Sequence, residues 1–231
     1  MLKSSCTDPS QPDSRDVAFS VAPRINAAGR MAHPAEALAV FEAARDEEAA
    51  RQRVDRLNQL NMERRRTVKL HFEELVEAVG TNIPAGLVVY RETSPKGIAG
   101  LLASKCVERY SVPSIVLVPS TIPGQVVGSG RSIPGVDLVK TLEPLEDLFL
   151  RFGGHAQAVG LTMGVDRIEQ FREKFAGLLD RWCEEAAKGC MRKQISPYHL
   201  STATSSTRSF CLNRSEKEIV PQCSPYAWPK S

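Results

Sequence analysis

Two glycine-bearing segments of the sequence carry residue types that bind phosphate groups, residues 128–132 (GSGRS) and 152–160 (FGGHAQAVG). Glycine has no Cβ, so backbone N–H groups in such segments can converge on an anion. Arg131 adds a bidentate charged fork, and His155 meets a helix dipole if it opens a helical turn. Alternatively, the glycines only form turns between strands and His155 is an ordinary surface residue. The candidate phosphate-binding residues are Ser129, Arg131, Ser132, Gly153, Gly154 and His155.

A third segment, residues 24–30 (RINAAGR), combines two cations, an amide and a helix-breaking glycine. With Pro23 it predicts a loop whose cations and amide could serve a ligand. It is equally consistent with an interdomain loop whose arginines are only solvated. The run Arg64-Arg65-Arg66 is interpreted as a solvated helix face, because acidic residues lie near it.

Several kinds of catalytic site find no support in the sequence. Two-metal phosphodiester hydrolysis needs clustered carboxylates and histidines around the ions, and no DxD or Asp-His-His cluster occurs. Ser129 and Ser132 have no recognisable His and Asp partners for nucleophilic catalysis. The six cysteines form no CxxC pair, which argues against a zinc site. These features indicate a binding unit without its own catalytic centre and without a cofactor or metal in this chain.

The composition is that of an ordinary globular protein. The 231 residues are 42% hydrophobic and 25% charged, which argues against wholesale disorder and coiled-coil classes. No apolar stretch reaches the roughly 18–20 residues needed to span a bilayer, and the N-terminus does not resemble a secretory signal. We therefore expect a cytoplasmic protein without a membrane partner. The basic excess lies at the end: residues 188–231 hold seven basic and two acidic residues, whereas residues 1–187 hold 23 and 25.

The elements that must position these residues can be read from periodicity and from breakers. Apolar residues at threes and fours predict a long helix over 46–79, with Asp46 as its cap and Gly80 at its end. Strand, helix and strand at 86–90, 98–110 and 114–119 indicate a βαβ unit and therefore a partly parallel sheet. Further predictions are a flexible leader (1–20), a helix after Pro34 (35–44), a strand (125–132), helices (136–142, 144–152 and 166–187) and a disordered tail (188–231).

The order of five segments resembles the bacterial RecJ single-stranded-DNA exonucleases over residues 21–187. The segments are APRINAAGRM, LNQLNMERRR, GIAGLLASKCVERYSVPSIVL, GSGRSIPGVDL and RFGGHAQAVGLTM. The resemblance implies an α/β fold: a connector loop and helices over 21–80, then a DHHA1-type domain over 84–187 with a mixed, partly parallel sheet flanked by helices. In the DHH phosphoesterase superfamily this domain grips substrate opposite a metal-bearing DHH domain.

The same resemblance implies roles for the candidate residues. Ser129 and Arg131 would hold the 5′ phosphate of single-stranded DNA, and residues 153–155 would contact the backbone near the scissile phosphate. Asn26 and Arg30 would face the cleft from the other side. The Mn²⁺ or Mg²⁺ ions of the family belong to the DHH domain, which this sequence does not contain. Cleavage, 5′ to 3′ in the family, would need that domain in trans.

Two alternatives stay open at this point. The first is the same architecture acting on short oligoribonucleotides or cyclic dinucleotides. The second is a non-catalytic interaction module or a remnant of an exonuclease gene. Departures from the family pattern include Ser94-Pro95-Lys96 and Ala99 in the segment SPKGIAGLLAS, and a tail unlike that of the family.

Overall fold

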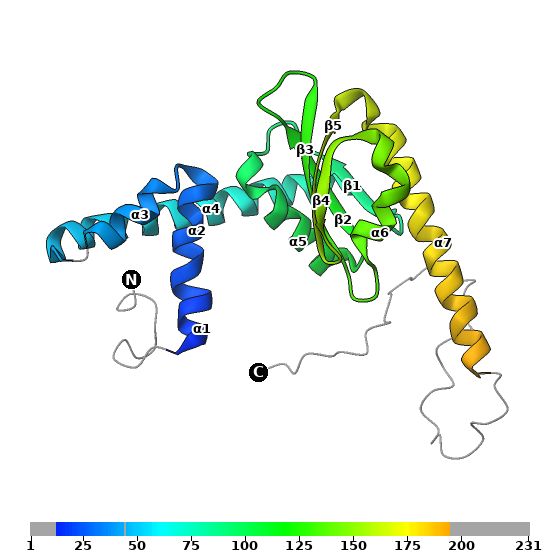
Figure 1. Ribbon diagram of the computed structural model, residues 1–231, viewed down its shortest axis with the longest axis horizontal. Helices are drawn as coiled ribbons and strands as arrows, with labels where there is room; N and C mark the ends of the chain where they lie inside the picture. The colour runs from blue at the N-terminus through cyan, green and yellow to red at the C-terminus, as the bar shows by residue number, and fades with distance from the viewer. Residues whose placement is uncertain (1–12, 44, 195–231) are drawn as a thin grey trace, which may run out of the picture.

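The chain forms a helical arm joined to an α/β domain (Figure 1). The computed structural model describes residues 13–43 and 45–194, with side-chain environments described as far as residue 184. The long helix α4 (Glu47–Val79) runs from the outer end of the arm to the domain. Helix α2 (Ala22–Met31) crosses α4 and α3 (Ala35–Glu42) packs against it, whereas α1 (Ser14–Asp16) and the π-helix η2 (Val17–Val21) continue the line of α2 away from α4.

Helix α4 confirms the predicted long helix and both of its caps. The Asp46 side chain accepts a hydrogen bond from the backbone N–H of Ala49 at 3.1 Å, which satisfies one of the free donors of the first turn. At the other end Gly80 has φ 69°, a left-handed conformation that ends helices and that other residues rarely adopt. The helix after Pro34 is confirmed as α3, with Pro34 at its N-cap.

The loop predicted around residues 24–30 is wrong, because these residues form helix α2. Pro23 lies in the first turn, where its missing N–H costs nothing. Ala27 and Ala28 are fully buried in one small cluster with Leu57 and Leu60 of α4, so their short side chains allow the two helices to approach closely. The prediction of a flexible leader is likewise wrong for residues 14–20, which are helical, while residues 1–12 lie outside the described part.

The domain is built on a five-stranded mixed sheet, which confirms the predicted fold class. Its strand order is β1-β2-β3-β5-β4, with β1 and β2 parallel and the other neighbours antiparallel. The strands are β1 (Leu87–Tyr90), β2 (Ser114–Pro119), β3 (Gln125–Arg131), β4 (Phe149–His155) and β5 (Ala158–Gly164). The parallel pair is joined by η3 (Lys96–Ile98) and α5 (Ala99–Tyr110), as the βαβ pattern predicts.

Helices cover the two faces of the sheet unequally. Helices α5 and α4 pack on one face over β1 and β2 through a cluster that includes Leu102, Val116 and Leu75. The other face is covered by α6 (Leu138–Leu142), η4 (Glu143–Leu148) and α7 (Ile168–Gln194), and Figure 1 shows α7 on the side away from the arm. A short 3-10 helix, η5 (Val165–Arg167), leads into α7.

Three predictions in the second half of the domain need correction. The helix expected over 144–152 is η4 followed by strand β4 from Phe149 onward. The helical turn expected over 155–159 is the β4–β5 hairpin, so no helix dipole acts at His155. The pattern predicts a disordered tail from residue 188, but α7 continues to Gln194, and residues 195–231 lie outside the described part.

A polar contact fastens α4 to the loop after β1. The Arg91 guanidinium donates to the Glu74 carboxylate, and His71 Nδ1 lies 3.1 Å from the hydroxyl of the buried Ser94. Together, the Arg91–Glu74 and His71–Ser94 contacts hold the loop between β1 and η3 against α4. They therefore link the arm to the segment at Lys96 and Gly97, which faces α2.

Replacing Glu74 by Gln is expected to lower the free energy of unfolding by about 1 kcal/mol, because the largely buried Arg91 guanidinium loses its ionic partner. Glu73→Gln is the matched control, since among the described residues Glu73 pairs with exposed Lys69 alone, at 3.9 Å, and the change should alter stability by less than about 0.5 kcal/mol. Urea unfolding followed by circular dichroism measures both. Equal effects of the two substitutions would contradict a stabilising role for the Arg91–Glu74 pair.

Candidate nucleic-acid interface

Strand β3 separates its alternating residues between the two faces of the sheet. Gly128 and Gly130 face the apolar core, where an added Cβ would lie 2.6 Å from Leu117 and from Val159 respectively. Ser129 and Arg131 therefore point to the opposite face, toward α5. The expectation that glycine amides converge on an anion is wrong for this segment, because β3 pairs with β2 and β5 along both edges and its backbone groups are used in the sheet. Side chains provide the donors here.

Arg131 and Ser129 form one wall of a hollow between the arm and the domain. Arg131 donates to the Ser129 hydroxyl at 3.1 Å and to the Gly130 carbonyl at 2.7 Å, which fixes the direction of its guanidinium. The hollow has a volume of about 550 Å³. We call it the arginine hollow; its lining residues are Gly29, Arg30, Lys96, Gly97, Ala99, Gly100, Val127, Gly128, Ser129 and Arg131.

The opposite wall of the arginine hollow comes from the arm. Arg30 of α2 donates to the Gly97 carbonyl at 2.9 Å, so helix α2 and the turn η3 are held together across the hollow. A glycine allows this approach, and a second glycine gives Arg131 its place beside α5. A Cβ on Gly97 would lie 2.1 Å from the Arg30 carbonyl oxygen, and a Cβ on Gly100 would lie 2.8 Å from the Arg131 guanidinium.

The positive charge of the arginine hollow has no acidic partner among the described residues. None of the ion pairs in this part of the chain includes Arg30 or Arg131. Burial, and then the charge of Arg30, lower the pKa of Arg131 below its usual range. Two guanidiniums that repel each other in a partly desolvated hollow would both be stabilised by an anion that accepts from them.

Strands β5 and β4 extend the face of the sheet that carries Ser129 and Arg131 beyond the arginine hollow. In register, Arg131 pairs with Ala158 and Ala158 with His155, while Ser129 pairs with Gly160 and Gly160 with Gly153. Paired residues share a face, so His155 lies on the same side as Arg131, two strands and therefore roughly 10 Å away. His155 and Gly153 are exposed.

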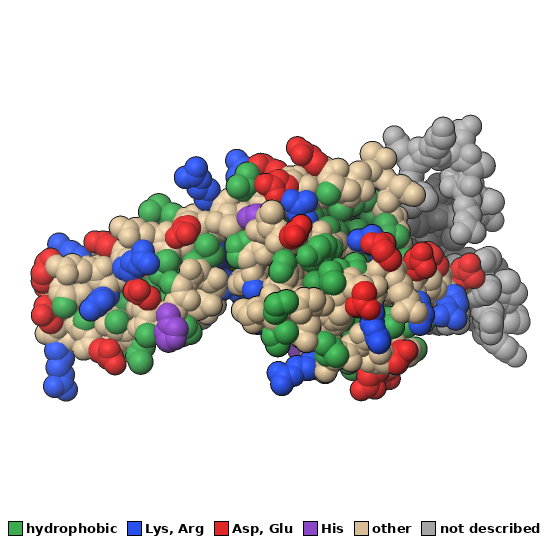
Figure 2. Space-filling view, turned by 90° about the horizontal axis from the view of Figure 1, so that it is seen from above, with side chains coloured by type: hydrophobic (Ala, Val, Ile, Leu, Met, Phe, Trp, Pro, Cys, Tyr) green, Lys and Arg blue, Asp and Glu red, His purple; other side chains and the backbone are tan. Residues whose placement is uncertain are grey.

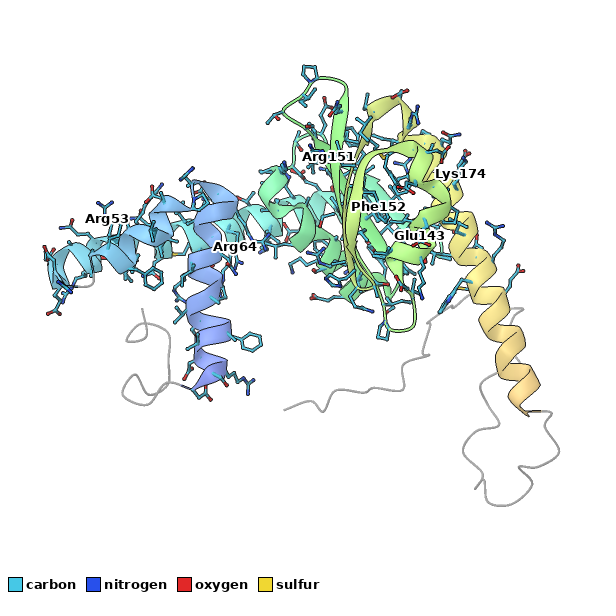
Figure 3. The ribbon with its side chains drawn as sticks, viewed as in Figure 1. Arg53, Arg64, Glu143, Arg151, Phe152 and Lys174 are labelled. Carbon is cyan, nitrogen blue, oxygen red and sulfur yellow. The ribbon has the colours of Figure 1, made fainter. Side chains whose placement is uncertain are left out.

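The floor of this surface is smooth because two glycines lie side by side. A Cβ on Gly153 or on Gly160 would meet no atom of the described residues within 4 Å, so the packing of these residues requires neither glycine. Arg151 is exposed at the next position of β4 on this face, opposite Thr162. Figure 3 shows it beside Phe152, which packs against the core cluster on the other face. A flat strip of backbone edged by cations suits a sugar-phosphate chain.

The predicted site residues do not all gather on this surface. Ser132 is buried and donates to the Val136 carbonyl at 2.7 Å, which gives it a structural role in the turn after β3. Gly154 faces away from the strip, with φ 154° and an added Cβ 2.2 Å from the Ala158 carbonyl oxygen. Asn26 is exposed one helical turn before Arg30 and does not line the hollow.

Sequence reasoning missed four residues that shape the site: Lys96, Gly97, Gly100 and Arg151. The first three belong to a helix start whose contact with α2 depends on the tertiary packing of the arm. Arg151 lies in a segment predicted as helix, and a strand assignment with a bulge between Phe149 and Arg151 is needed to bring it to this face. The one sequence signal for Arg151 is its position two residues before the glycine pair Gly153-Gly154.

The described side chains offer no metal centre. Among the side chains described, those of residues 13–43 and 45–184, there is no group of three or more His, Cys, Asp or Glu that could hold a metal ion. Metal ions of the kind the family uses therefore do not fit the residues present here. Burial raises the pKa of the Cys106 thiol to about 12, so it is protonated at neutral pH. Within the described part, each helix is too short or too polar to cross a bilayer.

Charge is mixed over the rest of the visible surface. Figure 2 shows the arm and the domain as two lobes, with Lys and Arg side chains interspersed with Asp and Glu over this view. The affinity for an anion must therefore arise from the local arrangement around the arginine hollow. It cannot come from a uniformly basic face in this view.

Comparison with known proteins gives a consistent assignment. The sequence-family model of the DHHA1 domain matches residues 84–181 of this chain. The chain is 36% identical over 194 residues to the single-stranded-DNA-specific exonuclease RecJ of Dickeya dadantii, covering 80% of this chain and 33% of that protein. It is 34% identical over 195 residues to the RecJ of Salmonella typhimurium, covering 80% and 34%.

The fold agrees with the sequence relationship. The crystal structure of RecJ from Thermus thermophilus in complex with Mg²⁺ superposes with a TM-score of 0.68 at 26% identity, over 78% of this chain and 27% of that one. The matched part includes most of the described residues. The chain is therefore a DHHA1-domain relative of the RecJ single-stranded-DNA exonucleases, and it spans about one third of the length of the curated relatives it matches.

Proposed function

We propose that this chain supplies the DNA-gripping part of a RecJ-type 5′ to 3′ exonuclease and binds the 5′-phosphorylated end of single-stranded DNA. The observation that carries the proposal is the arginine hollow, where Arg30 of the arm and Ser129 and Arg131 of β3 converge without an acidic partner among the described residues. A terminal phosphate carries more charge than an internal phosphodiester and offers three acceptor oxygens. It therefore matches two guanidiniums and a hydroxyl.

The exposed backbone at Gly160 and Gly153 gives the DNA a path away from its 5′ end. From the arginine hollow, the DNA would run over Gly160 and Gly153 toward His155, with Arg151 at the edge of this path. Contacts of this kind are made to phosphates and sugars, so they favour binding with little sequence preference. Hydrolysis would take place where a DHH domain holds Mn²⁺ or Mg²⁺ ions against the strand, and those ions would activate the attacking water.

Arg131→Ala is expected to weaken binding of 5′-phosphorylated oligothymidylate about tenfold and to remove the preference over the 5′-hydroxyl form, because a charge-assisted hydrogen bond is lost. The measurement is fluorescence anisotropy at several salt concentrations, where the slope of log K against log salt should fall by about one. Arg109→Ala is the control: this residue lies exposed near the end of α5, outside the hollow.

Equal affinity of the wild-type chain for the phosphorylated and hydroxyl forms would contradict the proposal. A cyclic dinucleotide added as competitor addresses the alternative substrate class directly. It has no terminal phosphate, so it should compete poorly. Tighter binding of the cyclic dinucleotide than of phosphorylated DNA would replace the proposed function with that alternative.

A further inference from the structure

Lys96 is a third cation of the arginine hollow, and the proposed site for the terminal phosphate does not use it. That phosphate is assigned to the guanidiniums of Arg30 and Arg131 and to the Ser129 hydroxyl. Lys96 lines the hollow from the first position of η3. It is exposed, and no ion pair among the described residues includes it. Its ammonium group is therefore available to an anion in the hollow.

The arginine hollow has more room than one phosphate group needs. Its volume of about 550 Å³ lies within the roughly 300–1,000 Å³ of pockets that enclose whole small molecules, whereas a phosphate group has only five heavy atoms. The described residues that line the hollow include no aromatic side chain, so a base has no ring on which to stack. The remaining room therefore suits further charged groups better than it suits a base.

Lys96 and the proposed path of the DNA belong to different sides of β3. The path leaves the hollow over Gly160 of β5, which pairs with one edge of β3. Helix α5 packs over β2, the strand on the other edge of β3, and η3 leads directly into α5. A terminal phosphate bound at Arg131 would therefore have the DNA on its β5 side and Lys96 on its other side. Phosphate groups added beyond the first would extend toward Lys96.

We propose that the arginine hollow accepts the 5′-triphosphate end of a nucleic-acid strand, and that Lys96 binds the phosphates beyond the first. The inference rests on the proposed function and deepens it, because it names the kind of strand end that the same site takes. The residue types fit this division. The forked guanidiniums of Arg30 and Arg131 suit one phosphate in a fixed position, whereas the point charge of Lys96 on its flexible stem suits the mobile outer phosphates.

The test compares oligothymidylates that differ only at the 5′ end, which carries a hydroxyl, a monophosphate or a triphosphate. In anisotropy titrations with EDTA, the 231-residue chain should bind the triphosphate form about tenfold more tightly than the monophosphate form. Its salt slope should be steeper by about one, as expected for an added ionic contact. Free thymidine 5′-triphosphate shares the end group but lacks the strand, so it should compete at least tenfold more weakly than the triphosphorylated oligonucleotide. Equal competition would make a free nucleotide the ligand and overturn the inference.

Substitution of Lys96 tests its part in the site. Lys96→Ala should abolish the advantage of the triphosphate form and leave the affinity for the monophosphate form within about twofold, whereas Lys96→Arg should keep most of the advantage. The matched control is Lys174→Ala, which removes an exposed lysine from α7 on the other face of the sheet (Figure 3). It should leave the affinities for all three oligonucleotides within about twofold. The melting temperature checks that each variant is folded.

The outcomes separate this inference from the function on which it rests. If the wild-type chain prefers the monophosphate form over the hydroxyl form but binds the triphosphate form no more tightly, the inference is wrong and the proposed function stands. If the advantage of the triphosphate form persists in Lys96→Ala, the assignment to Lys96 is overturned. If the wild-type chain binds the hydroxyl form as tightly as both phosphorylated forms, the proposed function itself fails.

Discussion

Replacing Phe171 by alanine is expected to lower the free energy of unfolding by about 3–5 kcal/mol, the cost of emptying a well-packed aromatic site. Phe171 is fully buried on α7, behind the sheet that carries Ser129 and Arg131. Its ring packs edge-on against Phe149 at 5.3 Å between centroids and stacks on Phe175 at 5.8 Å. Removing the Phe171 ring takes away contacts with both strand β4 and helix α7. Neighbouring side chains are held by these two elements, so they cannot easily collapse into the cavity.

Thermal unfolding followed by circular dichroism measures this effect. A loss of this size corresponds to a drop of roughly 10 °C in the melting temperature of a chain of this length. Phe41→Ala is the control, because Phe41 is 62% exposed on the arm and its truncation should cost less than about 0.5 kcal/mol. A similar small change for Phe171→Ala would mean that α7 is not part of the cooperative core.

The elements that follow local rules could be predicted from the sequence. Helix α4 is marked by an acidic N-cap, a regular apolar spacing and a glycine at its end, and all three signals act within one turn of the residues they concern. The unit β1-α5-β2 is marked in the same way by β-branched runs around an amphipathic segment. In both regions local preference and tertiary packing agree, so the sequence pattern is sufficient.

The wrong predictions concern segments in which packing overrides a local signal. Gly29 by itself favours a break in the helix, yet α2 is stabilised by burying Ala27 and Ala28 against α4, which outweighs the modest cost of one glycine. Strand β4 contains two adjacent glycines and shows poor strand character by itself. It forms because β5 provides a partner along its length.

The candidate site was only partly predictable for the same reason. The motif at residues 128–132 identified Ser129 and Arg131, but its glycines serve the packing of the sheet and not the display of amides. The proximity of Arg30 and Gly97 depends on how the arm meets the domain, and no local pattern near either residue encodes that contact. The residues implied by the resemblance included Arg30, whereas Gly97 became evident only in the folded chain.

The contact between Arg30 and Gly97 gives the second large prediction. Gly97→Ala is expected to lower the free energy of unfolding by about 1–3 kcal/mol, the usual cost of overpacking, and to weaken binding of 5′-phosphorylated single-stranded DNA at least tenfold. The new Cβ would lie 2.1 Å from the Arg30 carbonyl oxygen, with two more backbone atoms of Arg30 within 2.9 Å. Backbone cannot rotate aside as a side chain can, so α2 must move away from η3.

That movement would separate the two walls of the arginine hollow and break the hydrogen bond from Arg30 to the Gly97 carbonyl. Gly29→Ala is the matched control, because Gly29 also lines the hollow but its added Cβ would meet only Pro34 at 3.7 Å, an ordinary contact. In a helix this change should leave stability equal or raise it by up to about 1 kcal/mol, with affinity within about twofold. Melting temperature and anisotropy titration measure both variants. If the Gly97→Ala variant binds DNA as tightly as the Gly29→Ala variant does, the arm is not a wall of the binding site. The terminal phosphate would then be held by β3 alone.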